Sequence, residues 1–187
     1  MKQKSTFSTY RIVFIAVMAA IVCVVTFFRF PLLGSKVHLA NAMCLLSGLL
    51  FGPVGGGLAA GLGSGLYDVL FGGYDIIQGL ITFVSKFLMA AICAWIAGTH
   101  KGKLNHLRVV VAAVVGALSY VLLYMLKTFV YQRFVYGYPM ETTWATMLSK
   151  LPASVINAAV GIVVSLVLFF AMSPALKKAG LLEKIEK

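Results

Sequence analysis

Long runs of apolar residues, bounded by charged residues, glycine or proline, divide the chain into segments that suit helices crossing a lipid bilayer. Most runs approach or exceed the roughly 20 residues that a helix needs to span the hydrocarbon core. The second run is shorter and ends at Gly52-Pro53, so we expect it to tilt into the protein or to be partly re-entrant. The six expected spans cover residues 12–28, 39–51, 54–71, 76–97, 109–130 and 144–170.

The composition leaves no polar face for a water-soluble fold. Hydrophobic residues make up 61% of the 187 residues and charged residues only 11%, whereas a soluble domain has about 25% charged residues. The mean hydropathy is +0.97. We therefore expect a single all-α transmembrane domain over residues 1–187. The segment 173–187 mixes leucines with lysines and is expected to form a short helix lying in the membrane interface.

The distribution of Lys and Arg predicts how the chain is oriented in the membrane. If both termini are cytoplasmic, most of the 16 basic residues lie on the cytoplasmic side, and Lys86, Lys127 and Lys150 lie within spans. Cytoplasmic loops are enriched in basic residues, so we expect the N and C termini in the cytoplasm. Topology and contact with lipid headgroups account for the net charge of +11, and we expect no nucleic-acid partner.

Residues with catalytic or metal-binding chemistry are sparse. The three cysteines lie within apolar runs and the three histidines flank helices, without a second ligand at useful spacing. The glycine-rich stretch 52–65 lacks a following Gly-Lys-Ser/Thr and indicates close helix packing rather than a phosphate loop. We expect no metal, no cofactor and no enzyme activity.

Polar side chains within the last four spans gather in what the expected orientation makes the outer half of the membrane. Within each span their spacing places them on one helical face. An ionisable group at mid-membrane costs about 3 kcal/mol on insertion scales, so these groups need partners or water. We expect a water-accessible cavity that opens outward and binds a solute. The polar faces comprise Ser64, Tyr67, Asp68; Asp75, Gln78, Thr82, Ser85, Lys86; Tyr120, Tyr124, Lys127, Tyr131; and Trp144, Met147, Lys150, Ser154, Asn157.

Structural explanations compete with a binding role for some of these residues. Tyr131 and Trp144 equally fit an aromatic belt at the membrane interface. Asp68 and Lys86 fit a buried structural ion pair better than a pair of ligand-binding groups. A lysine that only extends to the interface does not need further polar side chains along its face, so Lys150 favours the binding interpretation.

Five short segments carry a resemblance to a known family. They are the pair Ala16 and Ala20 in the first span and the stretches 37–41, 49–55, 63–68 and 81–86. These segments resemble the substrate-binding S component of energy-coupling factor (ECF) vitamin transporters, in the branch of riboflavin-type S components. That branch also includes proteins assigned to the uptake of pyridoxine, thiamin pyrimidine and queuosine precursors.

The resemblance implies a protein of the bacterial cell membrane that captures a vitamin or related micronutrient from outside. It implies delivery through an ECF module, made of a transmembrane coupling subunit and two cytoplasmic ATPase subunits. It also implies that the face with Ala16 and Ala20 docks on the coupling subunit, although ordinary internal packing explains the same pair. The alternatives from other classes are a stand-alone secondary transporter or channel and a small membrane-embedded enzyme.

The candidate substrate-binding residues combine most of the polar faces with residues that precede or begin the second span. Basic groups outnumber acidic ones and aromatic rings are available for stacking. We therefore expect a planar heterocycle rich in hydrogen-bond acceptors, such as a flavin, pyridoxine, a thiamin pyrimidine or a queuosine precursor. The candidates are Lys36, His38, Asn41, Tyr67, Asp68, Gln78, Lys86, Tyr124, Lys127, Tyr131, Trp144, Lys150, Ser154 and Asn157.

Overall fold

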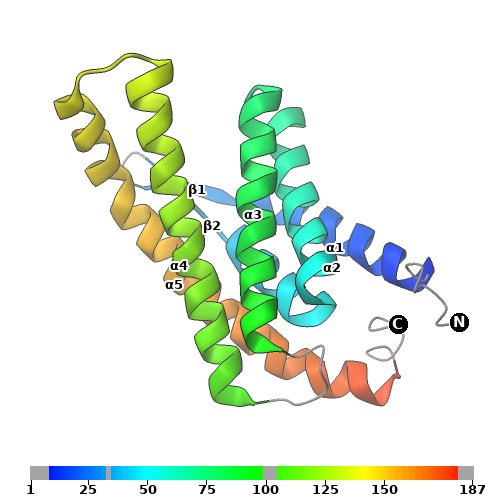
Figure 1. Cartoon of the computed structure of the whole chain (residues 1–187). Helices are drawn as coiled ribbons and strands as arrows, with labels where there is room; N and C mark the ends of the chain where they lie inside the picture. The colour runs from blue at the N-terminus through cyan, green and yellow to red at the C-terminus, as the bar shows by residue number, and fades with distance from the viewer. Residues whose placement is uncertain (1–8, 33–34, 99–104, 181–187) are drawn as a thin grey trace, which may run out of the picture.

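The computed structural model describes residues 9–32, 35–98 and 105–180. These residues form five long helices, a short π-helical turn and one β-hairpin (Figure 1). All five helices are long and apolar enough to cross a membrane, which agrees with the expected all-α membrane fold. In chain order the elements are α1 (Thr9–Phe27), β1 (Arg29–Leu32), β2 (Ser35–His38), α2 (Ala40–Leu70), α3 (Ile76–Ala97), α4 (His106–Val130), η2 (Tyr131–Val135) and α5 (Met140–Lys178).

Helix α2 is broken at Gly52 into two arms. Gly52 has φ = 74°, in the left-handed region that glycine tolerates, and Pro53 has no backbone N–H to continue the helical hydrogen bonds. The chain turns back on itself at this break. This is shown by the Ser47 hydroxyl, which donates a hydrogen bond of 3.0 Å to the Gly56 carbonyl, nine residues later. The two arms correspond to the second and third expected spans.

Helix α2 also lies at the centre of the bundle, packed against α1, α3 and α5. Its apolar segment is 78% buried, compared with 28–39% in the other four helices. Glycines let the neighbouring helices approach closely. A Cβ atom at Gly48 would collide with the backbone oxygen of Ala90 in α3, and one at Gly63 would collide with that of Ala19 in α1.

The outer faces of the helices are apolar. Trp95, Leu122 and Val167 are 62–75% exposed, and many other large apolar side chains lie on the same outer surface. A surface with so much exposed apolar area suits contact with lipid tails rather than water. The chain is a multi-pass membrane protein.

Local signals set the limits of α3 and α4. The Asp75 carboxylate caps α3 by accepting a hydrogen bond from the Gln78 N–H at 2.7 Å, and the helix ends before Gly98, which has φ = 61°. The Asn105 side chain caps α4 by accepting from the Arg108 N–H at 3.3 Å. The expected span 76–97 therefore coincides with α3.

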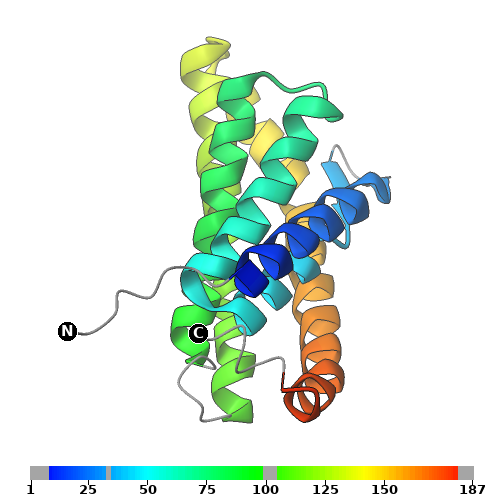
Figure 2. The ribbon, with the colours of Figure 1, turned by 90° about the vertical axis from the view of Figure 1, so that its right-hand side faces the viewer.

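Helix α5 is longer than expected. The expected span 144–170 and the first part of the expected interfacial helix 173–187 belong to one helix that ends at Lys178. Residues 173–178 continue α5 through Pro174, and the interfacial position expected for the segment 173–187 stays a prediction. The end of α5 nevertheless points away from the axis of the rest of the helix (Figure 2). Residues 181–187 lie outside the described part of the chain.

The hairpin of β1 and β2 was not expected, since residues 29–38 suggested only a loop. Its strands are antiparallel, with Arg29 opposite His38 and Pro31 opposite Lys36. The backbone N–H of His38 donates a hydrogen bond of 2.8 Å to the side-chain oxygen of Asn157 in α5. This bond fixes the end of the hairpin against α5, next to the start of α2.

Candidate binding site

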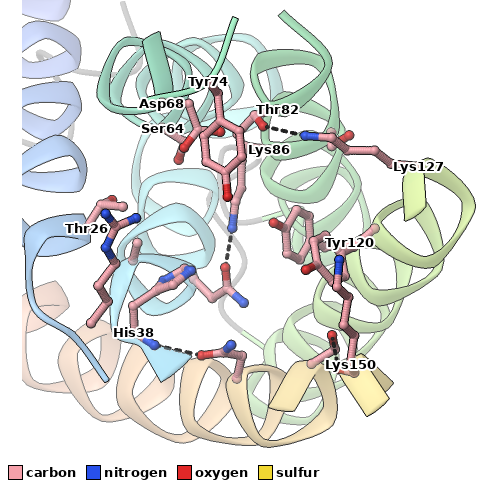
Figure 3. Close-up of a pocket in the computed structure, with 17 residues that line it drawn as sticks. Thr26, His38, Ser64, Asp68, Tyr74, Thr82, Lys86, Tyr120, Lys127 and Lys150 are labelled. Carbon is pink, nitrogen blue, oxygen red and sulfur yellow. Dashed lines mark hydrogen bonds between the residues drawn. The ribbon is translucent and has the colours of Figure 1, made fainter. Parts of the chain in front are cut away.

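A polar cavity of about 210 Å³ lies among α2, α3, α4 and α5, with the end of α1 and the hairpin on one side. Within the described part of the chain, its wall carries four basic side chains, one carboxyl group, three tyrosine rings and several hydroxyl and amide groups. Figure 3 shows these side chains pointing inward from different helices. The bundle thus surrounds a partly open space, lined by both polar and apolar surface, within an apolar exterior.

Lys86 of α3 is the most deeply buried basic group of this wall, with 2% of its surface exposed. Its ammonium group donates a hydrogen bond to the side-chain oxygen of Asn41 in α2. It also lies 3.6 Å from the centre of the Tyr120 ring in α4, a cation–π contact. Asp68 also lines the cavity, but it forms no ion pair with Lys86 among the described residues. The prediction of an ion pair between Asp68 and Lys86 was wrong.

Lys127 lies in the last turn of α4. Its ammonium group donates to the Thr82 hydroxyl at 3.4 Å and lies 5.7 Å from the centre of the Tyr74 ring. A second cavity of about 150 Å³ lies beside it. Four residues line both cavities, so the two spaces adjoin. The shared residues are Tyr74, Tyr124, Lys127 and Lys150.

His38 and Tyr74 of the main cavity lie outside the membrane-spanning helices, and their surroundings shift their pKa values. Burial, together with the positive charges of Lys86 and Arg29, lowers the pKa of His38 from 6.5 to about 3. The His38 ring is therefore neutral at neutral pH, and its buried Nδ1 has no hydrogen-bond partner within the described part of the chain. Burial, with the nearby Asp68 carboxylate, raises the pKa of Tyr74.

Nine of the fourteen candidate substrate-binding residues line the main cavity. Two others, Gln78 and Tyr131, line the second cavity instead. The side chain of Lys36 lies outside what the structure describes. The nine residues of the main cavity are His38, Asn41, Asp68, Lys86, Tyr124, Lys127, Lys150, Ser154 and Asn157.

The remaining two candidates, Tyr67 and Trp144, lie outside both cavities. The buried Tyr67 ring packs edge-on against Phe27 of α1, with 4.8 Å between ring centres. Trp144 is 52% exposed and packs against Phe129 at 6.4 Å. The exposure of Trp144 favours the aromatic-belt interpretation for this residue.

Eight lining residues were not among the candidates. Thr82, Ser85 and Tyr120 lie on the polar helical faces, so their spacing was a usable signal. Arg29 and Tyr74 lie in connections between helices, where helical spacing says nothing about side-chain direction. The eight residues are Thr26, Arg29, Ala40, Ser64, Tyr74, Thr82, Ser85 and Tyr120.

The small-residue pair of α1 lies on an exposed face. Ala16 and Ala20 are exposed, whereas Ile15 and Met18 are buried against the bundle. Ala19 is half-buried, and its backbone oxygen is the atom that limits the space at Gly63 of α2. Internal packing within this chain therefore does not account for Ala16 and Ala20.

Comparisons with known proteins agree with this architecture. The family model described as "ECF-type riboflavin transporter, S component" matches residues 6–174. A solved structure titled "Structure and mechanism of the S component of a bacterial ECF transporter" shares the fold with a TM-score of 0.66 at 20% identity, covering 89% of this chain and 97% of that chain. An "Uncharacterized protein in gap 3'region" of Pyrococcus woesei is 36% identical over 104 residues, or 54% of this chain. The match covers 66% of that relative, just under two thirds of its length.

The bundle of apolar helices around a cavity lined by polar side chains is typical of a small multi-pass membrane protein of the transport class. The chain belongs to the ECF-type riboflavin transporter S component family. This is a family of transporter components and not of enzymes.

Proposed function

We propose that this protein is the substrate-binding S component of an ECF importer and that it holds a vitamin or related micronutrient in the main cavity. The observation that carries the proposal is the convergence of charged and aromatic side chains from separate helices on one cavity. Charged groups within a membrane are costly, and a purely structural core does not need several of them around a cavity. Binding of a polar solute accounts for their presence.

The lining favours a planar heterocycle. Tyr74, Tyr120 and Tyr124 offer ring faces for stacking, and the lysines, hydroxyls and amides around them offer hydrogen-bond donors. A flavin, pyridoxine, a thiamin pyrimidine and a queuosine precursor all combine a flat ring with several acceptors. The family description makes riboflavin the first compound to test.

We further propose that the substrate enters from outside the cell. The second cavity lies beside the main one at the end of α4 and involves η2, opposite the helix ends that carry the larger share of basic residues. The basic ends are expected to face the cytoplasm. In this orientation the two cavities open towards the outer surface of the cell membrane. The bacterial identity of that membrane rests on the resemblance alone, and the curated relative comes from an archaeon.

Delivery of the substrate requires a partner, since the chain has no nucleotide-binding motif. We propose a transmembrane coupling subunit and two cytoplasmic ATPase subunits as that partner. The exposed edge with Ala16 and Ala20 offers a surface where a helix of the coupling subunit approaches the α1 backbone closely.

Binding and transport test the proposal separately. Mass spectrometry of the compound that copurifies with the protein, followed by titration of riboflavin and that compound, measures binding. Lys150→Leu and Asn157→Leu are expected to weaken binding without unfolding the protein. Ser149→Leu, at an exposed position of α5, is the control. Unchanged affinity in both cavity variants would exclude α5 from the site.

Uptake of the same compound is then measured in cells with and without an ECF module. We expect uptake only when the coupling subunit and the ATPases are present. Uptake by this protein alone would indicate a stand-alone carrier and would contradict the proposal.

A further inference from the structure

The main cavity has more positively than negatively charged side chains in its wall. Among the described residues that line it, Arg29, Lys86, Lys127 and Lys150 carry basic groups, and Asp68 carries the one carboxyl group. Basic groups in a cavity within a membrane bundle repel one another, and the surrounding low dielectric strengthens that repulsion. The wall therefore has an excess of positive charge that its own acid does not balance.

Neutral partners, rather than acids, satisfy the two lysines whose contacts are defined. Lys86 donates to the Asn41 amide, and Lys127 donates to the Thr82 hydroxyl. No ion pair joins a lysine of the cavity to an acid within the described part of the chain. The next acid along the chain, Asp75, caps α3 and is not part of the main cavity wall.

The three lysine ammonium groups come from three different helices and point into a common space. Figure 3 shows Lys86 extending from α3, Lys127 from α4 and Lys150 from α5, around the Tyr120 ring. Asp68 lies on the opposite side of this space from Lys150. Its carboxylate therefore cannot neutralise Lys150, but it can accept a hydrogen bond from another part of a bound molecule.

We infer that the substrate of this cavity is a planar heterocycle that carries an acidic group, either a carboxylate or a phosphate, bound between Lys127 and Lys150. The inference rests on the proposed function and narrows its substrate class. Lys127 and Lys150 are the lysines that line both cavities, so an entering anion meets them first. An acidic group balances the excess charge and accepts charge-assisted hydrogen bonds, whereas a neutral acceptor satisfies only the hydrogen bonds.

Two tyrosine rings for contact with the ring of such a substrate line the same cavity as these lysines, and the Lys86 ammonium lies over one face of the Tyr120 ring. Tyr120 and Tyr124 lie one helical turn apart on α4, with 6.3 Å between their ring centres. Lys127 follows on the same face of the helix. The tyrosine rings and the lysine thus lie next to each other on α4, where they can contact the ring and the acidic substituent of one flat molecule.

The test uses pairs of compounds that share a ring and differ in an acidic group. Riboflavin is compared with flavin mononucleotide, pyridoxine with pyridoxine phosphate, and nicotinamide with nicotinate. Affinities are measured by calorimetry on the purified full-length protein, and the copurified compound is identified by mass spectrometry. The same measurements are made on Lys127→Gln and Lys150→Gln, with Lys178→Gln, at the exposed end of α5, as the control.

We expect the copurified compound to be acidic and the acidic member of at least one pair to bind about 100-fold more tightly than its neutral partner. Each cavity variant should reduce the affinity for the acid by about 10- to 100-fold, as expected for loss of one charged hydrogen-bond partner. Lys178→Gln should leave it unchanged.

Other outcomes separate this inference from the proposed function. Tight binding of a neutral heterocycle, with affinity unchanged in both cavity variants, would overturn the inference and leave the proposed function intact. A protein that retains no compound and binds none of the six probes would contradict the proposed function itself, and with it the inference.

Discussion

Lys86 of α3 and Asn41 of α2 are 45 residues apart in the chain and joined by a hydrogen bond in the centre of the bundle. Each side chain is only 2% exposed. Asn41 lies in the first turn of α2, directly after the hairpin, and Lys86 carries the charge nearest to the Tyr120 ring. One contact therefore connects the packing of α2 and α3 to the wall of the cavity.

We predict that Asn41→Leu destabilises the protein by about 1–3 kcal/mol, because it leaves the Lys86 ammonium group buried without its amide partner. The double variant Asn41→Leu/Lys86→Met should recover part of this loss, because both polar groups are then removed. Thermal unfolding in detergent measures both effects. Strictly additive losses in the double variant would show that the two side chains do not support each other.

A second prediction concerns Gly48, where the backbones of α2 and α3 lie in close contact. A Cβ atom at Gly48 meets backbone of α3, which cannot move aside, so Gly48→Ala should lower the stability by about 1–3 kcal/mol. Gly55→Ala is the matched control, because its nearest contact is the end of the Ile15 side chain, at 3.2 Å. Equal stability of the two variants in thermal unfolding would show that α2 and α3 do not pack this closely.

The two faces of α1 allow docking to be separated from folding. Ala16→Trp and Ala20→Trp add bulk to an exposed edge and should leave the purified protein folded and able to bind its substrate. They should abolish transport and pull-down of the coupling subunit, because a large side chain keeps a partner helix several ångströms away.

Ala19→Trp is the control for that experiment. Ala19 is half-buried and its backbone packs closely against α2 at Gly63, so the tryptophan should instead disturb the fold and broaden the elution peak. Retained transport in the Ala16 and Ala20 variants would rule out this edge as the docking surface.

Membrane orientation is tested with single cysteines at the two ends of the bundle. Leu107 is 72% exposed at the start of α4, and Glu141 is exposed at the start of α5, near the opposite end (Figure 1). In a Cys23→Ala background, Leu107→Cys should react only with reagents that reach the cytoplasm, and Glu141→Cys with impermeant reagents from outside. The reverse labelling pattern would invert the proposed topology.

The stability of the protein should fall in mild acid through His38. Its pKa is lowered to about 3 in the folded protein and is near 6.5 in an unfolded chain. Between these values the unfolded chain binds a proton that the folded protein does not, so the free energy of unfolding falls as the pH falls, by at most about 1.4 kcal/mol per pH unit. Lys86 of α3 and Arg29 of β1 are the charged groups that disfavour the protonated ring.

The difference between wild type and His38→Gln isolates this effect from other titrating groups. We expect the variant to lose part of the pH dependence of thermal unfolding between pH 6.5 and 4. His106→Gln, at an exposed histidine near the other end of the bundle, should retain it. Equal pH dependence in wild type and His38→Gln would show that burial of this ring does not disfavour its charged form.

Features that depend on neighbouring residues along the chain were predictable from the amino-acid sequence. A lipid-spanning helix is selected by local hydrophobicity, and α3 accordingly covers the expected residues 76–97. The break at Gly52-Pro53 follows from the backbone preferences of two residues. The polar faces of α4 and α5 follow from the constant helical period. They contribute two lysines, two tyrosines, a serine and an asparagine to the main cavity, whereas Trp144 lies outside it.

Only the tertiary structure decided which faces meet. In the folded protein Lys86 contacts Asn41 instead of Asp68. Tyr67 packs between α1 and α2, against Phe27, instead of lining the cavity. The tertiary structure also ordered residues 29–38 as a hairpin whose last residue bonds to Asn157 in α5. Helical spacing sets the direction of a side chain relative to its own helix, whereas its partner depends on how that helix is rotated and placed against the others. That placement is determined by packing between residues far apart in the chain, which no local pattern encodes.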